Sequence, residues 1–224
     1  MKAAATPRIK ICCIASVEEA AMAVEAGASA LGLVSRMPSG PGIISDELIA
    51  EIAATVPPAV GTFLLTSRQS VDEIVVQQRF CGTNTIQICD HLTRGTHCEL
   101  KQALPGISIV QVVHVTGPES LVEAAAVAPH VDAVLLDSGN QKFAIKELGG
   151  TGRTHDWSLS RQIRERISVP LFLAGGLTPE NVAQAIAEVG PFGLDVCSGV
   201  RTGGKLDADK LARFFAAVRT TLSN

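Results

Sequence analysis

Short apolar runs alternate with amphipathic segments along the chain, and the alternation is repeated eight times. The runs are rich in Val, Ile and Leu, as is typical of parallel strands that are buried on both faces. We expect strands over residues 8–14, 30–34, 60–65, 85–88, 107–114, 131–137, 170–174 and 193–196. The segments between them predict helices over 16–27, 46–55, 70–79, 98–104, 118–127, 159–166, 179–189 and 208–222. Two of these helices begin with a capping box, Ser16-Val-Glu-Glu19 and Ser70-Val-Asp-Glu73.

Eight strand–helix units in 224 residues favour a closed (β/α)8 TIM barrel over a doubly wound sheet, which usually has fewer units. No linker or shift in composition divides the chain. We therefore expect an α/β protein in which residues 1–224 form a single barrel domain. Active sites on this fold lie at the C-terminal ends of the strands, so polar residues at those positions are the candidates for chemistry.

The composition excludes several classes of protein. Hydrophobic residues make up 46% of the chain and charged residues 18%, which excludes intrinsic disorder. A net charge of −3 and 4% aromatic residues argue against nucleic-acid binding by bulk charge or base stacking. The N-terminus lacks the apolar run of a signal peptide, and no apolar stretch of about 18 residues predicts a membrane span. Six cysteines without a CxxC pair, and five histidines without metal-ligand spacing, predict a cytoplasmic protein with reduced thiols and no metal site.

Two strand ends carry candidates for acid–base chemistry. Side chains alternate along the first strand, so Lys10 and Cys12 should point into the barrel mouth, while Cys13 should face the helices as a small buried residue. The Lys10 ammonium would favour the thiolate of Cys12, which is therefore a candidate base or nucleophile, with a structural cysteine as the alternative. Asp137 ends the sixth apolar run, where a carboxyl group is a candidate acid or base, or else caps the following turn.

Small residues follow the last two predicted strands. Leu173-Ala-Gly-Gly-Leu177 comes after the seventh strand and Asp195-Val-Cys-Ser-Gly-Val200 after the eighth. Backbone N–H groups in such loops can hold a phosphate, and many barrels build their phosphate site from these two loops. Asp195 shares the inward face with Cys197 and is a candidate for binding substrate hydroxyls, or is structural. Arg36, in the Gly/Pro-rich loop after the second strand, is a candidate for binding an anionic substrate, although most surface arginines have no such role.

Taken together, these segments resemble the phosphoribosylanthranilate isomerase family, the barrel isomerases of tryptophan biosynthesis. They run in family order from residue 10 to about 207, and their combination is specific where any single one would not be. The matching segments are Lys10-Ile-Cys12, Ala26-Gly-Ala28, Leu31-Gly-Leu-Val34, Val60-Gly-Thr-Phe63, Gln87, Leu135-Leu-Asp137, Gly149-Gly-Thr-Gly152, Asp156-Trp157, Leu173-Ala-Gly-Gly-Leu177, Asn181-Val182 and Asp195-Val-Cys-Ser-Gly-Val200.

The resemblance implies an intramolecular oxidoreductase, an aldose–ketose isomerase that converts N-(5-phosphoribosyl)anthranilate into 1-(2-carboxyphenylamino)-1-deoxyribulose 5-phosphate by an Amadori rearrangement. By this analogy Asp137 is the acid that opens the furanose ring, and Cys12 is the base that removes the proton from C2. The resemblance further implies that the substrate phosphate binds to the backbone amides of Gly175, Gly176, Ser198 and Gly199. The rest of the substrate is expected to contact Lys10, Arg36, Gln87 and Asp195. The implied partner is a small phosphorylated-sugar substrate, without a cofactor, and the expected state is a monomer or a homodimer.

The sequence departs from the family pattern around the anthranilate ring. Two segments differ: Ser39-Gly-Pro-Gly42 lacks the Arg of the family's Ser-Pro-Arg segment, and Gln87-Ile-Cys-Asp90 replaces Gln-Leu-His-Gly. Three single residues also differ, because Cys13 replaces Gly, His155 replaces Phe and Arg201 replaces Glu. Arg36 and Arg201 are the candidates to substitute for the missing Arg. Two alternatives stay open: a related isomerase that acts on another phosphorylated sugar, and a non-catalytic barrel that binds a phosphate ligand.

Overall fold

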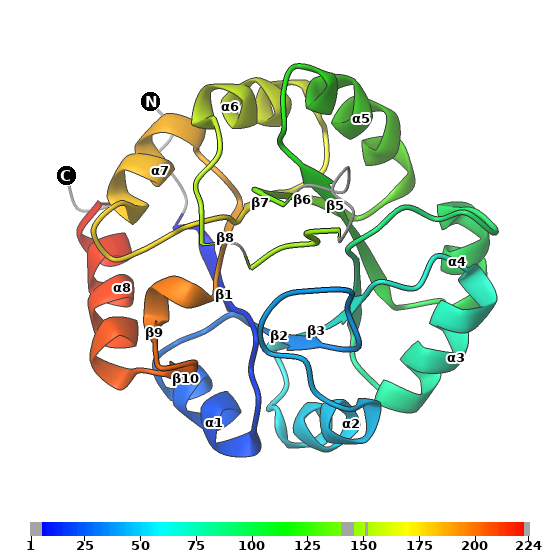
Figure 1. The fold of residues 1–224 in the computed structure, drawn as a ribbon, viewed down its shortest axis with the longest axis horizontal. Coiled ribbons are helices and arrows are strands. Elements are labelled where there is room, and N and C mark those ends of the chain that lie inside the picture. Colours follow the sequence, from blue (N-terminus) through cyan, green and yellow to red (C-terminus); the bar gives the residue numbers. More distant parts are fainter. Residues whose placement is uncertain (1–5, 140–145, 151, 222–224) are drawn as a thin grey trace.

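The computed structural model describes residues 6–139, 146–150 and 152–221 of the chain. Eight parallel strands pair in sequence order, and the last pairs with the first, so that they close into a barrel surrounded by a ring of helices (Figure 1). The expected (β/α)8 barrel is therefore confirmed. The strands are β1 (Arg8–Ile11), β2 (Ala30–Val34), β3 (Gly61–Thr66), β4 (Thr85–Ile88), β5 (Ser108–His114), β6 (Ala133–Asp137), β7 (Leu171–Leu173) and β8 (Gly193–Val196).

The helices follow the predicted amphipathic segments to within a few residues. They are α1 (Val17–Glu25), α2 (Asp46–Thr55), α3 (Val71–Cys81), α4 (His97–Ala103), α5 (Glu119–Val127), α6 (Trp157–Arg166), α7 (Val182–Val189) and α8 (Ala208–Thr221). Residue 222, the last of the final predicted helix, lies outside the described residues. In the described part of the chain, no helix combines the length and apolar character needed to cross a bilayer.

Some local structure was not expected from the sequence. The short 3-10 helices η1 (Ala128–His130) and η2 (Ser198–Val200) interrupt two connections, and β9 (Arg201–Thr202) and β10 (Lys205–Leu206) form a small hairpin beside α1 and α8 (Figure 1). The Ser16 hydroxyl accepts a hydrogen bond from the Glu19 amide, as predicted. The capping box predicted at Ser70 is wrong, because Ser70 makes no side-chain cap; a backbone bridge between Ser70 and Arg94 lies at the start of α3.

Alternation along the strands divides the buried side chains into two layers. One layer fills the space between the strands and the helices and includes Ile11, Leu33 and Leu136. The other fills the inside of the barrel, where the rings of Phe63 and Phe172 meet edge to face with their centroids 5.9 Å apart. Because the interior is packed, a ligand can bind only at the ends of the strands.

Ala59 is held in a backbone conformation that suits glycine. Its φ is 75°, and the Val60 amide donates a hydrogen bond to the Pro57 carbonyl across the turn between α2 and β3. A type II turn requires a positive φ at this third position. We predict that Ala59→Gly raises the free energy of unfolding by about 0.5–1 kcal/mol, because relief of left-handed strain exceeds the added entropy of the unfolded chain. Urea denaturation measures the change.

The matched control for this variant is Ala54→Gly, on the exposed face of α2. There the same substitution should lower the free energy of unfolding by about 1 kcal/mol, because glycine is unfavourable inside a helix. A destabilised Ala59→Gly protein would contradict the prediction.

Candidate active site

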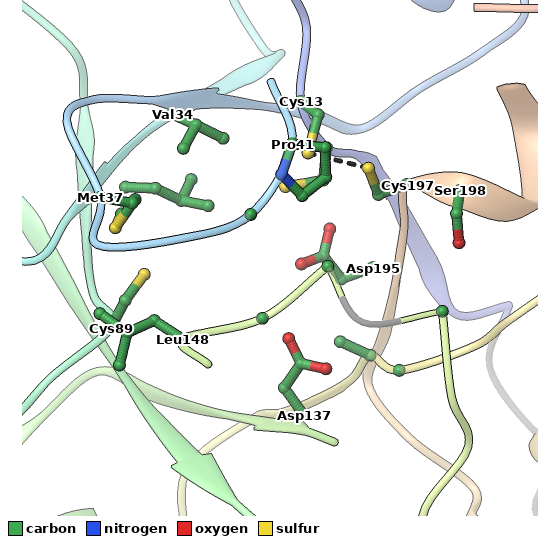
Figure 2. A pocket seen from close by; sticks show the side chains of 18 of the residues that line it. Cys13, Val34, Met37, Pro41, Cys89, Asp137, Leu148, Asp195, Cys197 and Ser198 are labelled. Atoms are coloured by element: carbon green, nitrogen blue, oxygen red, sulfur yellow. Dashed lines mark hydrogen bonds between the residues drawn. The ribbon is translucent and has the colours of Figure 1, made fainter. Parts of the chain in front are cut away.

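A pocket opens at the C-terminal ends of the strands (Figure 2). The loops after β1, β2, β6, β7 and β8 line it. Seven of the residues proposed from the sequence line this pocket: Cys12, Gln87, Asp137, Gly175, Gly176, Asp195 and Ser198.

Lys10 lies beneath the pocket and is fully buried. It stands opposite Asp195 in the register of β1 and β8, and its Nζ is 2.9 Å from Asp195 Oδ2 and 3.7 Å from Cys12 Sγ. Burial by itself lowers the pKa of Lys10, but the Asp195 carboxylate and the Cys12 sulfur outweigh it and raise the pKa above its ordinary value. Lys10 is therefore an ammonium, and it lies beside the sulfur of Cys12.

Asp137 ends β6 and points into the pocket (Figure 2). Burial raises the pKa of Asp137 to about 6, and the nearby Asp195 carboxylate acts in the same direction. Hydrogen bonding from Ser138, whose amide donates to Asp137 Oδ1 at 2.6 Å, and the charge of Lys10 oppose the shift only in part. A carboxyl group with this pKa can hold a proton near neutral pH and give it to a substrate.

Two buried acceptor atoms face the same space. Gln87 Oε1 and Asp195 Oδ1 have no hydrogen-bond partner in the described part of the structure, although both residues line the pocket. A buried polar atom without a partner is unfavourable, so these oxygens are suited to accept hydrogen bonds from a ligand. Among the described residues, no group of three or more His, Cys, Asp or Glu side chains is arranged to hold a metal ion.

The loops after β7 and β8 meet at one side of the pocket. Gly175 and Gly176 have φ values of 84° and 62°, which turn the backbone in a way that glycine adopts without strain. In the second loop, a Cβ added at Gly199 would collide with the carbonyl oxygen of Leu177. Glycine at position 199 therefore lets the two loops pack closely, and Ser198 lines the pocket beside them. A Cβ added at Gly176 would instead collide with the backbone of Arg153 and Thr154.

The turn after β1 differs from the expectation in one respect. Cys13 is buried, as predicted, but it lines the pocket and does not face the helices. Strand alternation applies only to extended residues; β1 ends at Ile11, and Cys13 has a left-handed φ of 62°. Its Sγ lies 2.8 Å from the Sγ of Cys197, from the loop after β8.

Arg201 fixes this turn through contacts outside the pocket. Its guanidinium forms a buried ion pair with Glu19, at 2.9 Å from Oε1, and also donates to the carbonyl oxygens of Cys12 and Cys13. The guanidinium therefore serves the turn and does not line the pocket. Nothing in the residue pattern indicated this pairing, because Glu19 and Arg201 are 182 residues apart.

Arg36 is not brought into the pocket. It is exposed and lines a neighbouring hollow with Asp46 and Glu47, and its carbonyl oxygen accepts a hydrogen bond from the Ser67 hydroxyl. The side of the pocket formed by the loop after β2 is instead apolar. No described residue that lines the pocket is Lys or Arg. This apolar wall was not predicted from the sequence, although the Gly/Pro-rich loop after β2 was noted as unusual. The wall consists of Val34, Met37, Pro41, Leu65 and Leu148.

A (β/α)8 barrel with a proton-holding carboxyl group and a thiol beside an ammonium at one pocket defines a barrel isomerase. The family model of N-(5'-phosphoribosyl)anthranilate isomerase matches residues 9–217, and the chain belongs to this family. N-(5'-phosphoribosyl)anthranilate isomerase 2 of Methanosarcina mazei is 37% identical over 209 residues, which span 92% of each protein. The expected family and its class of reaction, aldose–ketose isomerisation, are confirmed by these matches.

Solved structures agree with the family match. The crystal structure of phosphoribosylanthranilate isomerase from Thermotoga maritima has a TM-score of 0.79 and 32% identity, and the match covers 96% of this chain and 99% of that one. A complex of the enzyme with reduced 1-(o-carboxyphenylamino)-1-deoxyribulose 5-phosphate has a TM-score of 0.77 and 30% identity, with the same coverage.

The raised pKa of Asp137 predicts a pH dependence of stability. The folded protein holds this proton more tightly than the unfolded chain does, so the stabilisation is complete at low pH and is lost as the pH rises through about 6. The free energy of unfolding of the wild type, minus that of Asp137→Asn, should fall by about 2–3 kcal/mol between about pH 4 and pH 7. Urea denaturation of both proteins over this range checks it, and a difference that does not change with pH would refute it.

Proposed function

We propose that this pocket rearranges N-(5'-phosphoribosyl)anthranilate into the aminoketose, with Asp137 as the acid and Cys12 as the base. The observation that carries the proposal is that both groups line one pocket: the pKa of Asp137 is raised to about 6, and the sulfur of Cys12 stands 3.7 Å from the Lys10 ammonium. General acids and bases act best when each holds the required protonation state near the working pH.

Asp137 and Cys12 each carry out one of the proton transfers that begin the reaction. In the first, Asp137 gives its proton to the furanose ring oxygen while the bond from that oxygen to C1 breaks, and the anthranilate nitrogen forms a double bond to C1. In the second, the Cys12 thiolate removes the proton from C2, and those bonding electrons move to form an enolamine. A proton added at C1 and one lost from the C2 hydroxyl then complete the aminoketose, so the overall change is a shift of hydrogen within one molecule.

The neighbouring residues position these groups and the sugar. Lys10 remains protonated through its ion pair with Asp195 and places its ammonium 3.7 Å from the Cys12 sulfur. We assign to Asp195 Oδ1 and Gln87 Oε1 the binding of substrate hydroxyl or N–H groups, since both oxygens lack a partner. The aryl ring would lie on the apolar wall formed by Val34, Met37 and Leu148.

The phosphate is assigned to the two glycine loops, with the backbone amides of Gly175, Gly176, Ser198 and Gly199 as donors. Three features support this assignment: the loops follow β7 and β8, they pack against each other, and Ser198 opens the short helix η2. Loops at these two positions hold the phosphate in many barrels, and N–H groups of tight turns and helix starts favour anions.

Cys12→Ala and Asp137→Asn test the assigned roles. Each variant should lose about 10²–10⁴-fold in kcat, because each removes one positioned proton-transfer group. The assay generates phosphoribosylanthranilate in situ, and binding of a product analogue, measured by calorimetry, should survive in both variants. Full turnover by either variant would contradict its assigned role.

A second candidate is an isomerase that acts on another phosphorylated sugar, which the lack of Lys or Arg among the pocket-lining residues favours. It would be indicated by a wild type that binds sugar phosphates but does not turn over phosphoribosylanthranilate.

Gly199→Ala tests the phosphate site. The added methyl group collides with Leu177 and separates the two loops, so KM should rise at least about tenfold, since one or two hydrogen bonds to a charged group are lost. Inorganic phosphate should also inhibit the variant less strongly than the wild type. Gly203→Ala is the control, because it has a left-handed φ of 57° and open space around it. A KM that rises equally in both variants would overturn the assignment.

A further inference from the structure

Cys13 and Cys197 form a thiol pair that the proposed mechanism does not use. Their sulfur atoms are 2.8 Å apart at the rim of the pocket, where Figure 2 marks the contact with a dashed line. Cys13 follows β1, Cys197 follows β8, and both are free thiols in this structure. Their separation is shorter than an ordinary contact between two sulfur atoms and longer than a covalent bond of about 2.05 Å.

The pairing of β1 with β8 brings the turns that carry the two residues together. Ile11 is paired with Val196 in the register of β1 and β8, and the Cys12 amide donates to the Val196 carbonyl at 2.8 Å. The sulfur atoms are 2.8 Å apart, so they need to approach by only about 0.8 Å to reach the length of a disulfide bond.

The surroundings make the two thiols unequal. Hydrogen bonding with Cys13 lowers the pKa of Cys197, and the Arg201 guanidinium adds to this effect against the opposing effect of burial. Contacts with Cys12 and Cys197 raise the pKa of Cys13. Cys197 is also the more exposed of the two. A thiolate that is partly open to solvent, beside a second thiol, is the usual arrangement of a cysteine pair that exchanges with small disulfides.

We propose that Cys13 and Cys197 are a reversible oxidation site, at which a low-molecular-weight disulfide converts the two thiols into a disulfide bond. The Cys197 thiolate attacks one sulfur of the small disulfide, whose other half leaves as a thiolate. Cys13 then loses its proton and attacks Cys197 Sγ, which releases the second half. Two protein thiols are oxidised, and one small disulfide is reduced to two thiols.

The bond acts on the active site through the turn after β1. Cys13 is joined directly to Cys12, and Arg201 fixes the carbonyl oxygens of both residues. Oxidation therefore pulls the turn that holds Cys12 toward the loop that holds Ser198. A displacement of about 1 Å at a reacting group reduces the rate by up to roughly a hundredfold, so we expect kcat/KM to fall roughly ten- to a hundredfold in the oxidised protein. This consequence rests on the proposed function, whereas formation of the bond does not.

The first experiment locates the bond without any activity measurement. The purified protein is equilibrated with mixtures of reduced and oxidised glutathione, free thiols are alkylated, and tryptic peptides are analysed by mass spectrometry. The expected product links peptide 11–36 to peptide 167–201, increases with the share of oxidised glutathione, and disappears with dithiothreitol. The link should persist in Cys12→Ser and be absent from Cys13→Ala. A linked peptide that requires Cys12, or none under the most oxidising mixture, would overturn the proposal.

The second experiment measures, for each protein, the activity of its oxidised form relative to that of its own reduced form. The wild type and Cys98→Ser, which alters an exposed thiol on α4, should lose activity roughly ten- to a hundredfold and recover with dithiothreitol. Cys197→Ser and Cys13→Ala should have the same activity after oxidation as in their reduced forms. An equal loss in Cys197→Ser would overturn the control of activity by this pair. An inactive reduced wild type that still forms the link would refute the proposed function and leave the oxidation site supported.

Discussion

The buried ion pair between Lys10 and Asp195 is the interaction on which the rest of the site depends. It joins β1 to β8, the two strands whose pairing closes the barrel, and it lies directly beneath the pocket. Breaking such a pair leaves an uncompensated buried charge, which costs about 3–5 kcal/mol. The same ammonium stands beside Cys12, so one side chain contributes both to the closure of the fold and to the surroundings of the proposed base.

The two pocket carboxyl groups differ because of this pair. Asp195 has its cation at 2.9 Å, whereas hydrogen bonding from Ser138 and the charge of Lys10 offset the burial of Asp137 only in part. The pKa of Asp137 is accordingly raised to about 6. Two carboxyl groups in different environments can therefore serve one reaction as a proton donor and as a fixed acceptor.

The departures from the family pattern at Cys13 and Arg201 form one structural unit. Cys13 occupies a left-handed turn that favours glycine, and Arg201 donates to its carbonyl oxygen and to that of Cys12. Glu19, at the start of α1, neutralises the guanidinium and accepts a hydrogen bond from the Leu206 amide of β10. The small hairpin, the first helix and the turn that holds the base are thus connected by buried hydrogen bonds.

The sequence by itself determined the barrel and the group of candidate residues, because eight apolar runs must pair in order and parallel strands bring their C-terminal ends together. That is why the sequence alone predicts that Cys12, Asp137 and the two glycine loops lie at one pocket. The tertiary structure alone decided the directions and the distances. Cys13 faces the pocket because of its left-handed backbone angle, Arg36 lies outside the pocket, and Arg201 forms an ion pair with Glu19. Side-chain direction in a turn and contacts between residues about 180 apart depend on the closed barrel, and no local pattern in the sequence encodes them.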